Sequence, residues 1–374
     1  MANIYLDYAA TSRKHFDIIE KNLNILKEIY ANPSSGHTLG KKNEKLFRTA
    51  RERIAKSICA RPEEIIFTSG GTESNNTVFN HVLNRFDNGE IIISSIEHPS
   101  VKSSAKHLEK HGFIVHELSV GKAGIIDLEE LKQKINENTV LVSIMLANNE
   151  TGMLNPLKEI SEIIKDKNIL LHSDIVQAFG KVEIDVSDLN LDFASVSAHK
   201  IGALNNFGFL YAKNGEIEPF ILGGGQERGL RSGTSDLFGT LVLADCIDET
   251  LVSISKLREL KNYFLDKLEE NQIDFEINGL KNNSLPNIMN IYFKKIESQR
   301  LITYLDALAI YISGGSACSS GNIKGSRIIT EMYDIERASH SVRISIGFDI
   351  TKEDLDFVID KIVRLENRLK ERDN

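Results

Sequence analysis

The sequence predicts an α/β protein with a large domain built on a mostly parallel sheet and a smaller α+β domain. Apolar runs of strand length alternate with helical stretches in the first part of the chain, a pattern typical of parallel sheets covered on both faces. An amphipathic stretch without proline, from about residue 236 to 271, predicts one long helix or two in sequence and then precedes a second group of strands and helices. We therefore place the large domain at 16–250 and the small domain at 1–15 and 251–374.

Each element has its own signal. The β-branched and apolar runs predict strands at 64–69, 90–95, 139–146 and 168–174, and helical patterns cover 73–86, 100–112 and 157–167. Gly112 closes the second of these helices. In the small domain, strands are expected within 286–295, 308–315 and 340–348, and a final helix over 352–372.

Composition narrows the function classes. The 374 residues carry a net charge of -8, which argues against direct nucleic-acid binding as a main function. No apolar run approaches the roughly 20 residues of a membrane span, and the first residues, "MANIYLDYAATS", lack the features of a signal peptide. Three scattered cysteines favour neither a disulfide framework nor a metal site. We expect a cytoplasmic protein.

Lys200 is an unexpected residue in its surroundings. It follows a run that reads as a buried strand, in "SVSAHKIGALNNFGFLY". Buried lysines are rare unless they are paired or have a chemical use, such as a Schiff base with a carbonyl compound. The alternative is a strand-end lysine whose ammonium reaches solvent.

Polar residues follow other predicted strands. "FTSGGTESNN" places Gly71 and Thr72 at a helix start, where free backbone N–H groups suit a phosphate, although a glycine-rich turn with a threonine N-cap fits as well. Asp174 and His98 each follow a strand. Taken singly, Asp174 is also explained as a helix N-cap, and a histidine at a strand end is more often structural than catalytic. Together with Lys200 they predict a pyridoxal phosphate site at the sheet edge.

The cysteines differ in their surroundings. Cys318 lies in "SGGSACSSGNIKGS", among small residues that let a thiol approach a substrate and move away again. An ordinary thiol is only about 3% thiolate at pH 7, so Cys318 needs local activation or a nearby base such as His98. Cys59 and Cys246 lie on helical patterns beside apolar residues, and we expect both to be buried in the core.

The chain resembles the cysteine desulfurases of the NifS/IscS type, from residue 5 to 347. The resemblance rests on "SGGTESNN", "EHPS", "ANNETG", "DIVQAFGK", "SVSAHK", "GGGQERGLRSGT" and "SGGSACSSG", which occur in that order. It implies a fold-type I pyridoxal phosphate enzyme that acts as a homodimer. Such an enzyme takes sulfur from L-cysteine, releases alanine and holds the sulfur as a persulfide, here on Cys318. "GGSAC" is similar to the subgroup with a longer cysteine loop, which supplies iron–sulfur scaffolds and tRNA-thiolating enzymes.

The resemblance also implies roles for residues around the cofactor ring. Lys200 would form the internal aldimine, and His98 would stack on the ring and shuttle protons. Asp174 would pair with the pyridine nitrogen, while Gln177 and Asn149 would contact the ring hydroxyl. No metal site is expected, and an iron–sulfur cluster would contact Cys318 only transiently.

Further residues would hold the phosphate and the substrate. The cofactor phosphate would be bound by Gly71, Thr72, Ser197 and His199. Thr234, in "RSGTSD", would reach the phosphate of the other subunit, and Arg343, in "HSVRIS", would clamp the substrate carboxylate together with Asn149. A selenocysteine lyase or another class-V aminotransferase-like enzyme is the alternative.

Two positions depart from the family pattern. Residues 203–206 read "ALNN" where the family has Gly-Pro-Lys-Gly, and Phe348 stands where an arginine is common. These changes bear on loop conformation and partner choice rather than on the inferred catalytic residues.

Overall fold

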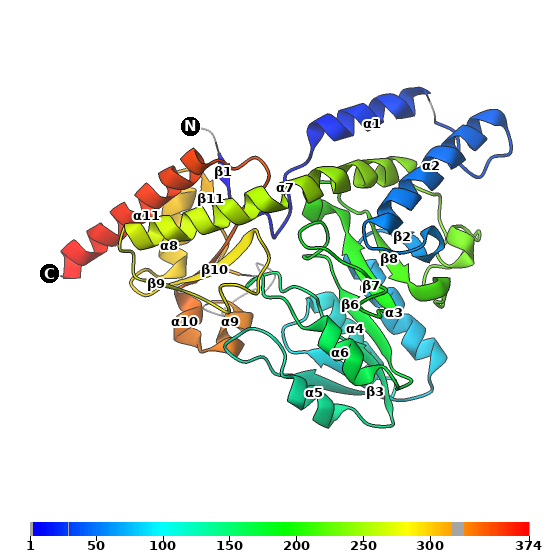
Figure 1. Ribbon diagram of the computed structural model, residues 1–374, viewed down its shortest axis with the longest axis horizontal. Coiled ribbons are helices and arrows are strands. Elements are labelled where there is room, and N and C mark those ends of the chain that lie inside the picture. Colours follow the sequence, from blue (N-terminus) through cyan, green and yellow to red (C-terminus); the bar gives the residue numbers. More distant parts are fainter. Residues whose placement is uncertain (1–2, 29, 316–324, 374) are drawn as a thin grey trace.

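Two lobes are joined by one long helix, α7 (Figure 1). The computed structural model describes residues 3–28, 30–315 and 325–373. α7 spans Leu237–Glu270, is capped by the side chain of Asp236, which accepts from the Gly239 N–H, and ends at Asn271. The predicted helix over 236–271 is therefore confirmed.

The larger lobe is built on a seven-stranded sheet in the order β2-β8-β7-β6-β5-β3-β4. Every pairing from β4 to β7 is parallel, and β8 runs antiparallel to both β7 and β2. The mostly parallel sheet that the sequence predicts is confirmed. Its strands are β2 (Ile65–Thr68), β3 (Glu90–Ser94), β4 (Ile114–Leu118), β5 (Thr139–Ser143), β6 (Leu170–Asp174), β7 (Phe193–Ser197) and β8 (Gly208–Ala212).

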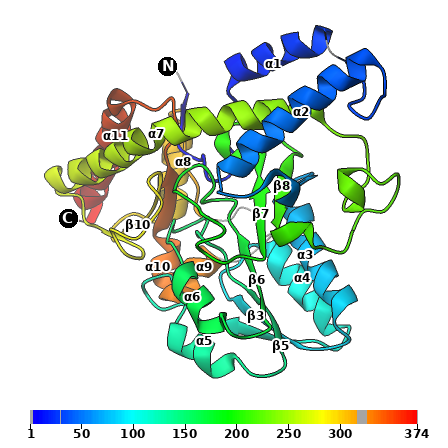
Figure 2. The same cartoon turned by 45° about the vertical axis from the view of Figure 1, so that its right-hand side comes forward.

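Helices cover both faces of this sheet (Figure 2). Because side chains alternate along a strand, Ile66 packs with the core under α3 and α4, whereas its neighbours Ile65 and Phe67 belong to the core on the other face. The helices of this lobe are α1 (Phe16–Glu28), α2 (Thr38–Lys56), α3 (Gly71–Arg85), α4 (Pro99–Glu109), α5 (Leu128–Lys134) and α6 (Leu157–Ile164). Short 3-10 turns cover Pro62–Glu64, Ala198–Ile201, Lys213–Gly215 and Glu227–Gly229.

The smaller lobe combines two small sheets with four helices. β9 (Phe275–Ile277), β10 (Ile288–Phe293) and β12 (Ser341–Ser345) form an antiparallel sheet, and β1 (Ile4–Tyr5) pairs in parallel with β11 (Ile310–Tyr311). The N-terminal segment thus joins the C-terminal part of the chain. The helices described here are α8 (Ser298–Asp306), α9 (Arg327–Met332), α10 (Ile335–Ser339) and α11 (Lys352–Asp373).

Each half of α7 belongs to a different core. Its first half, up to Ile247, packs with the core of the large sheet, and its second half, from Leu257, packs with the core of the smaller lobe. Between them, Leu251 and Val252 are exposed, by 41% and 82%. The domain boundary that we propose, between residues 250 and 251, falls in this exposed middle part of α7.

The two described cysteines differ from each other. Cys246 is fully buried in α7, as predicted, and burial raises the pKa of its thiol to about 12. The prediction that Cys59 is buried is wrong, because α2 ends at Lys56 and the chain turns through Cys59 with a φ of +58° and an exposed side chain. The helical pattern in the sequence continues past the residue where the helix stops.

Across the described ranges, no helix has both the length and the apolar character that a membrane crossing needs.

We expect Phe264→Ala to lower the free energy of unfolding by about 3–5 kcal/mol, because Phe264 is fully buried in the smaller lobe and its removal leaves a cavity. Urea unfolding followed by circular dichroism measures this change. Val252→Ala on the exposed part of the same helix is the control and should change stability by less than about 0.5 kcal/mol. Equal effects of the two substitutions would contradict the two-core description of α7.

Candidate active site

Three predicted site residues meet at the edge where the parallel strands end. β3 ends four residues before His98, β6 ends at Asp174, and β7 ends three residues before Lys200. Asp174 and Lys200 both lie close enough to His98 to influence its pKa. This edge is where open α/β sheets bind ligands.

Lys200 lies in the 3-10 turn Ala198–Ile201, and its ammonium is bound by the protein. Nζ donates to the carbonyl oxygens of Ala9 and Ala10, each at 2.7 Å. Ser12 Oγ in turn donates to the Lys200 carbonyl at 3.0 Å. The side chain does not simply extend into solvent, because the N-terminal segment crosses the sheet edge and holds it.

The start of α3 is open for an anion. The N-cap residue is Gly70, with a φ of +133° and no side-chain cap, so the alternative of a threonine cap is wrong. A Cβ atom at Gly70 would lie 3.2 Å from Ser197 Oγ, and one at Gly71 would lie 2.8 Å from a methyl of Val176. Only glycine fits this close approach, and Thr72 stands exposed beside it. Three of the predicted phosphate residues are therefore brought together.

His199, the fourth predicted phosphate residue, is neutral at pH 7. Burial, with Lys200 as the next cause, lowers its pKa to about 3. Nδ1 lies 3.1 Å from Thr11 Oγ1, so the N-terminal segment also orients this ring.

Asp174 and Gln177 are both buried and hydrogen-bonded. Asp174 Oδ1 accepts from the Val176 N–H at 3.0 Å, and Oδ2 accepts from Asn75 Nδ2 at 2.9 Å. Gln177 Nε2 donates to the Ala9 carbonyl at 2.9 Å, the same oxygen that binds Lys200. The two side chains that we expect at the cofactor ring are fixed before any ligand binds.

His98 is the N-cap of α4. Its Nδ1 accepts from the Ser100 N–H at 3.2 Å and lies 2.7 Å from Ser100 Oγ. The ring is open to solvent on one side, yet its protein surroundings lower its pKa: desolvation is the main cause, Asp174 opposes it and Lys200 adds to it.

Glu97, which the sequence analysis missed, lies beneath His98. Its Oε1 accepts from Ser94 Oγ at 2.6 Å and from the Met145 N–H at 2.8 Å. Full burial raises its pKa to about 8, so it is mostly protonated at pH 7. It links the loop that carries His98 to the end of β5.

Arg343 is buried on β12 and already has two partners. Nη1 donates to the Asn149 carbonyl at 2.9 Å, and Nη2 pairs with Asp7 Oδ1 at 2.6 Å. Nε is buried without a partner among the described residues. The structure brings Arg343 and Asn149 together, as predicted for a substrate clamp, and adds Asp7, which the sequence gave no reason to select.

Thr234 is exposed, three residues before α7. Its segment is attached to the start of α3 by Arg231, whose Nε lies 2.9 Å from Glu73 Oε1. Glu73 also accepts from the Ser69 N–H at 2.7 Å. The proposed role of Thr234 concerns a second subunit and stays a prediction.

Cys318 lies outside the described residues. Two described residues, Gly315 before it in the sequence and Ser326 after it, both lie at Glu150, a fully buried carboxylate next to Asn149. Ser326 Oγ donates to Glu150 Oε2, and a Cβ atom at Gly315 would lie 2.7 Å from that same oxygen. The role of Cys318 stays a prediction.

Lys181, at the end of "DIVQAFGK", is a second buried lysine that the sequence analysis did not single out. It is 3% exposed and donates to the Gln177 carbonyl at 3.0 Å and to Gln177 Oε1 at 3.3 Å. Burial, with repulsion from Lys200 and Arg343, lowers its pKa to about 7. A lysine within an apolar stretch, the same signal that marked Lys200, could have found it.

The two departures from the family pattern are accommodated locally. Asn206 has a φ of +53°, a conformation that asparagine tolerates better than most residues, and Asn205 accepts from Lys14 Nζ at 2.8 Å. Phe348 stacks on His15 with ring centroids 4.0 Å apart. Among the described residues, the hydrogen-bond partners of Asp174 and His98 include neither Phe348 nor any residue of 203–206.

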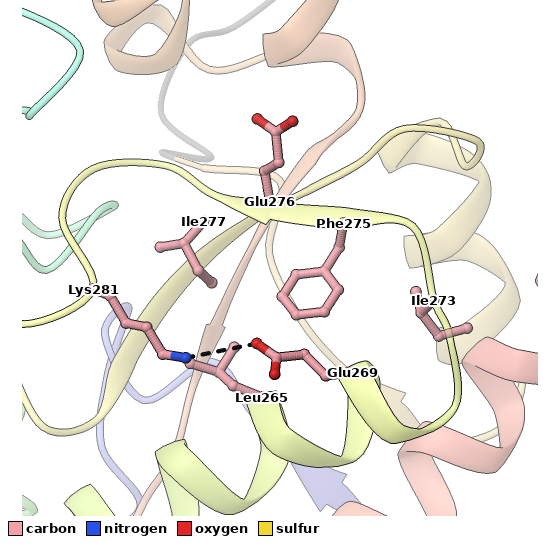
Figure 3. A pocket seen from close by; sticks show the side chains of 7 residues that line it. All are labelled: Leu265, Glu269, Ile273, Phe275, Glu276, Ile277 and Lys281. Carbon is pink, nitrogen blue, oxygen red and sulfur yellow. Dashed lines mark ion pairs between the residues drawn. The ribbon is translucent and has the colours of Figure 1, made fainter.

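A pocket of about 380 Å³ lies away from this site, in the smaller lobe between α7 and β9 (Figure 3). Leu265, Ile273, Phe275 and Ile277 give it apolar walls. Its polar groups do not converge on a ligand position: Lys281 and Glu269 pair with each other at 3.6 Å, and Glu276 points away. Its size alone does not make it a binding site, and we assign the chemistry to the sheet edge.

Comparisons with known proteins agree with this assignment. The family model for class-V aminotransferases matches residues 4–358. The cysteine desulfurase IscS of Dictyoglomus turgidum is 38% identical, covering 98% of this chain and 95% of that protein. Among solved structures, a NifS-like protein superposes with a TM-score of 0.89 at 33% identity, covering 97% of this chain and 99% of that one. A structure of SspA in complex with cysteine superposes with a TM-score of 0.82 at 31% identity, covering 92% of this chain and 98% of that one.

The fold and the lysine-bearing edge thus define an enzyme of the fold-type I class. The chain belongs to the class-V aminotransferase family, and within it to the group of the NifS and IscS cysteine desulfurases. The resemblance that the sequence motifs indicated is confirmed, as is the α/β fold.

Lys181→Met is expected to change how stability depends on pH. The folded-state pKa of about 7 lies below the ordinary value of 10.5, so between these values the unfolded chain binds a proton that the folded chain does not. The contribution of Lys181 to the free energy of unfolding is therefore constant below about pH 7. Above pH 7 it rises with pH, by up to roughly 1.4 kcal/mol per pH unit.

Urea unfolding at pH 7 and pH 9 measures this effect. The wild type should gain about 1–2 kcal/mol relative to Lys181→Met over that interval. Lys42→Met, at an exposed lysine, is the control and should follow the wild type. A parallel pH dependence of wild type and Lys181→Met would show that Lys181 is charged in the folded chain at pH 9.

Proposed function

We propose that this chain is a pyridoxal phosphate-dependent cysteine desulfurase that releases L-alanine and collects sulfur as a persulfide on Cys318. One observation carries the proposal: a lysine amine, Lys200, is held by backbone carbonyls at the sheet edge that also carries the buried carboxylate of Asp174 and the uncapped start of α3. Its relative in Dictyoglomus turgidum is named a cysteine desulfurase, and the similar SspA was solved in complex with cysteine.

The residues present fit the phosphate of this cofactor. The first turn of α3 begins at Gly70 and Gly71, where a side chain in place of either glycine would fill the space in front of Ser197 or Val176. Free N–H groups at a helix start attract anions. We assign the phosphate to Gly71, Thr72, Ser197 and His199, and we propose that Thr234 completes the site of the other subunit of a homodimer.

The ring would lie against Asp174, Gln177 and His98, three side chains that are already oriented. Asp174 would keep a proton on the ring nitrogen, Gln177 would contact the ring hydroxyl together with Asn149, and His98 would stack on the ring face. When bound, the cofactor supplies an electron sink for the substrate carbon atoms. Lys200 provides the amine that attaches it, since its Nζ already lies at this edge.

Arg343 would orient the substrate carboxylate, and Asp7 and the Asn149 carbonyl hold its guanidinium in place. The Cys318 thiolate would attack the substrate sulfur, so that a sulfur–sulfur bond forms as the carbon–sulfur bond breaks. The electron pair of that bond stays with carbon, which takes up a proton and becomes the methyl group of alanine. The products are alanine and a persulfide.

The sulfur acceptor would be another protein. We propose an iron–sulfur scaffold or a tRNA-thiolating enzyme, since the cysteine segment is similar to that of the longer-loop subgroup. We place the reaction in the cytoplasm, in agreement with the low number of cysteines.

Lys200→Ala is expected to abolish alanine formation and the absorption of lysine-bound pyridoxal phosphate, because the described site contains no second amine in the same position. Visible spectra and an alanine assay measure both. Lys42→Ala is the matched control. Alanine production by the Lys200→Ala variant at the wild-type rate would contradict the proposal.

Cys318→Ser should keep the cofactor spectrum and lose sulfide release, because the hydroxyl is a far weaker nucleophile toward sulfur. Cys59→Ser, at an exposed thiol outside the motifs, should retain full activity. If cysteine is not a substrate but another amino acid is converted, the family membership holds and the alternative of another class-V activity is correct. A higher kcat/KM for selenocysteine than for cysteine would identify a selenocysteine lyase.

A further inference from the structure

Asn75 links two residues of the site that are far apart in the sequence. Its Nδ2 donates both of its hydrogens, one to Asp174 Oδ2 and one to Ser100 Oγ, each at 2.9 Å. Ser100 Oγ lies 2.7 Å from His98 Nδ1. A continuous hydrogen-bonded chain therefore runs from Asp174 through Asn75 and Ser100 to His98, and Asn75 and Ser100 are buried.

The direction of these bonds is fixed from the Asp174 end. Asp174 accepts at both of its carboxylate oxygens, so the atom of Asn75 that faces it must be a donor. Turning the amide over would set Asn75 Oδ1 against the carboxylate. In the observed orientation Oδ1 has no partner among the described residues, so its two donors alone hold the amide in place.

The same order of donor and acceptor continues from Asn75 through Ser100 to His98. Because its Oγ accepts from Asn75, its own hydroxyl hydrogen is available for His98 Nδ1. The backbone N–H of Ser100 points at the same Nδ1 atom, at 3.2 Å. A hydrogen on Nδ1 would face both of these donors.

We propose that Asn75 is a positioning residue that fixes the tautomer of His98, with Nδ1 as the acceptor and the hydrogen on Nε2. The lone pair at Nδ1 accepts from Ser100, so a neutral His98 can donate a hydrogen bond through Nε2, and a proton taken up at Nδ1 would have to replace the hydrogen bonds from Ser100. The consequence for catalysis, which rests on the function proposed above, is that His98 orients groups at the ring and does not deprotonate Cys318 in the resting enzyme.

The tautomer can be observed directly. Long-range proton–nitrogen NMR spectra of the full chain, labelled with nitrogen-15 in histidine and loaded with pyridoxal phosphate, distinguish Nδ1–H from Nε2–H rings. His98→Gln assigns the signals. We expect His98 in the wild type to show the neutral Nε2–H pattern at pH 7.5. An Nδ1–H or doubly protonated ring would overturn the proposal.

Variants test the part played by Asn75. Asn75→Ala should shift the tautomer ratio toward Nδ1–H by about fivefold, equivalent to about 1 kcal/mol for one neutral hydrogen bond. Asn76→Ala is the matched control, since the next asparagine on α3 donates to the Thr72 carbonyl instead. An Asn75→Ala spectrum identical to that of the wild type would overturn the proposal.

A double-mutant cycle shows whether Asn75 acts through Ser100. Asn75→Ala should have no further effect on the tautomer in the Ser100→Ala background, because the bridging hydroxyl is already absent. The same shift in both backgrounds would contradict the chain of bonds. Ser100→Ala retains Asn75 and tests the link if Asn75→Ala does not fold. These spectra do not depend on turnover, so a failed desulfurase assay with the predicted tautomer would disprove the function alone.

Discussion

The site depends on one backbone residue, Ala9, where the two lobes meet. Its carbonyl oxygen accepts from Lys200 at 2.7 Å and from Gln177 at 2.9 Å, both in the larger lobe. Its N–H donates at 2.9 Å to Ser345 Oγ, on a strand of the smaller lobe. A backbone carbonyl oxygen has two lone pairs, and the Ala9 oxygen uses both of them to bind these two side chains. Removal of the N-terminal segment would leave a buried amide and an ammonium without these acceptors.

The charges around this point explain why the site suits anions. Lys181, Lys200 and Arg343 lie near one another, and each of the first two helps to lower the pKa of His199. Asp7 pairs with Arg343, while Lys181 has only the polar atoms of Gln177 as hydrogen-bond partners among the described residues. Burying such cations is unfavourable on its own. A bound phosphate or carboxylate would offset part of the cost of burying these cations. Part of the binding free energy would therefore come from relieving repulsion that is already present in the folded chain.

Patterns local in the sequence predicted the fold and part of the site. Strand-length apolar runs and the amphipathic pattern over 236–271 came from periodicity, and Lys200, His98 and Asp174 were found because each follows a strand. The partners of these residues were not predictable in the same way. Asn75 meets Asp174 across 99 positions and Arg343 meets Asp7 across 336, and such pairs depend on tertiary packing. Cys59 was misplaced because helical periodicity does not mark where a helix ends.

The pairing of β1 with β11 affects the order in which the chain can fold during its synthesis. Ile4 and Ile310 are partners, so the first strand emerges from the ribosome 306 positions before the strand it needs. At synthesis rates of about 5–20 residues per second, it waits roughly 15 to 60 seconds. During that time Ala9, which accepts from Lys200, also lacks Ser345, the residue that binds its N–H. The contacts that join the N-terminal segment to the smaller lobe therefore form only after most of these 374 residues have been made.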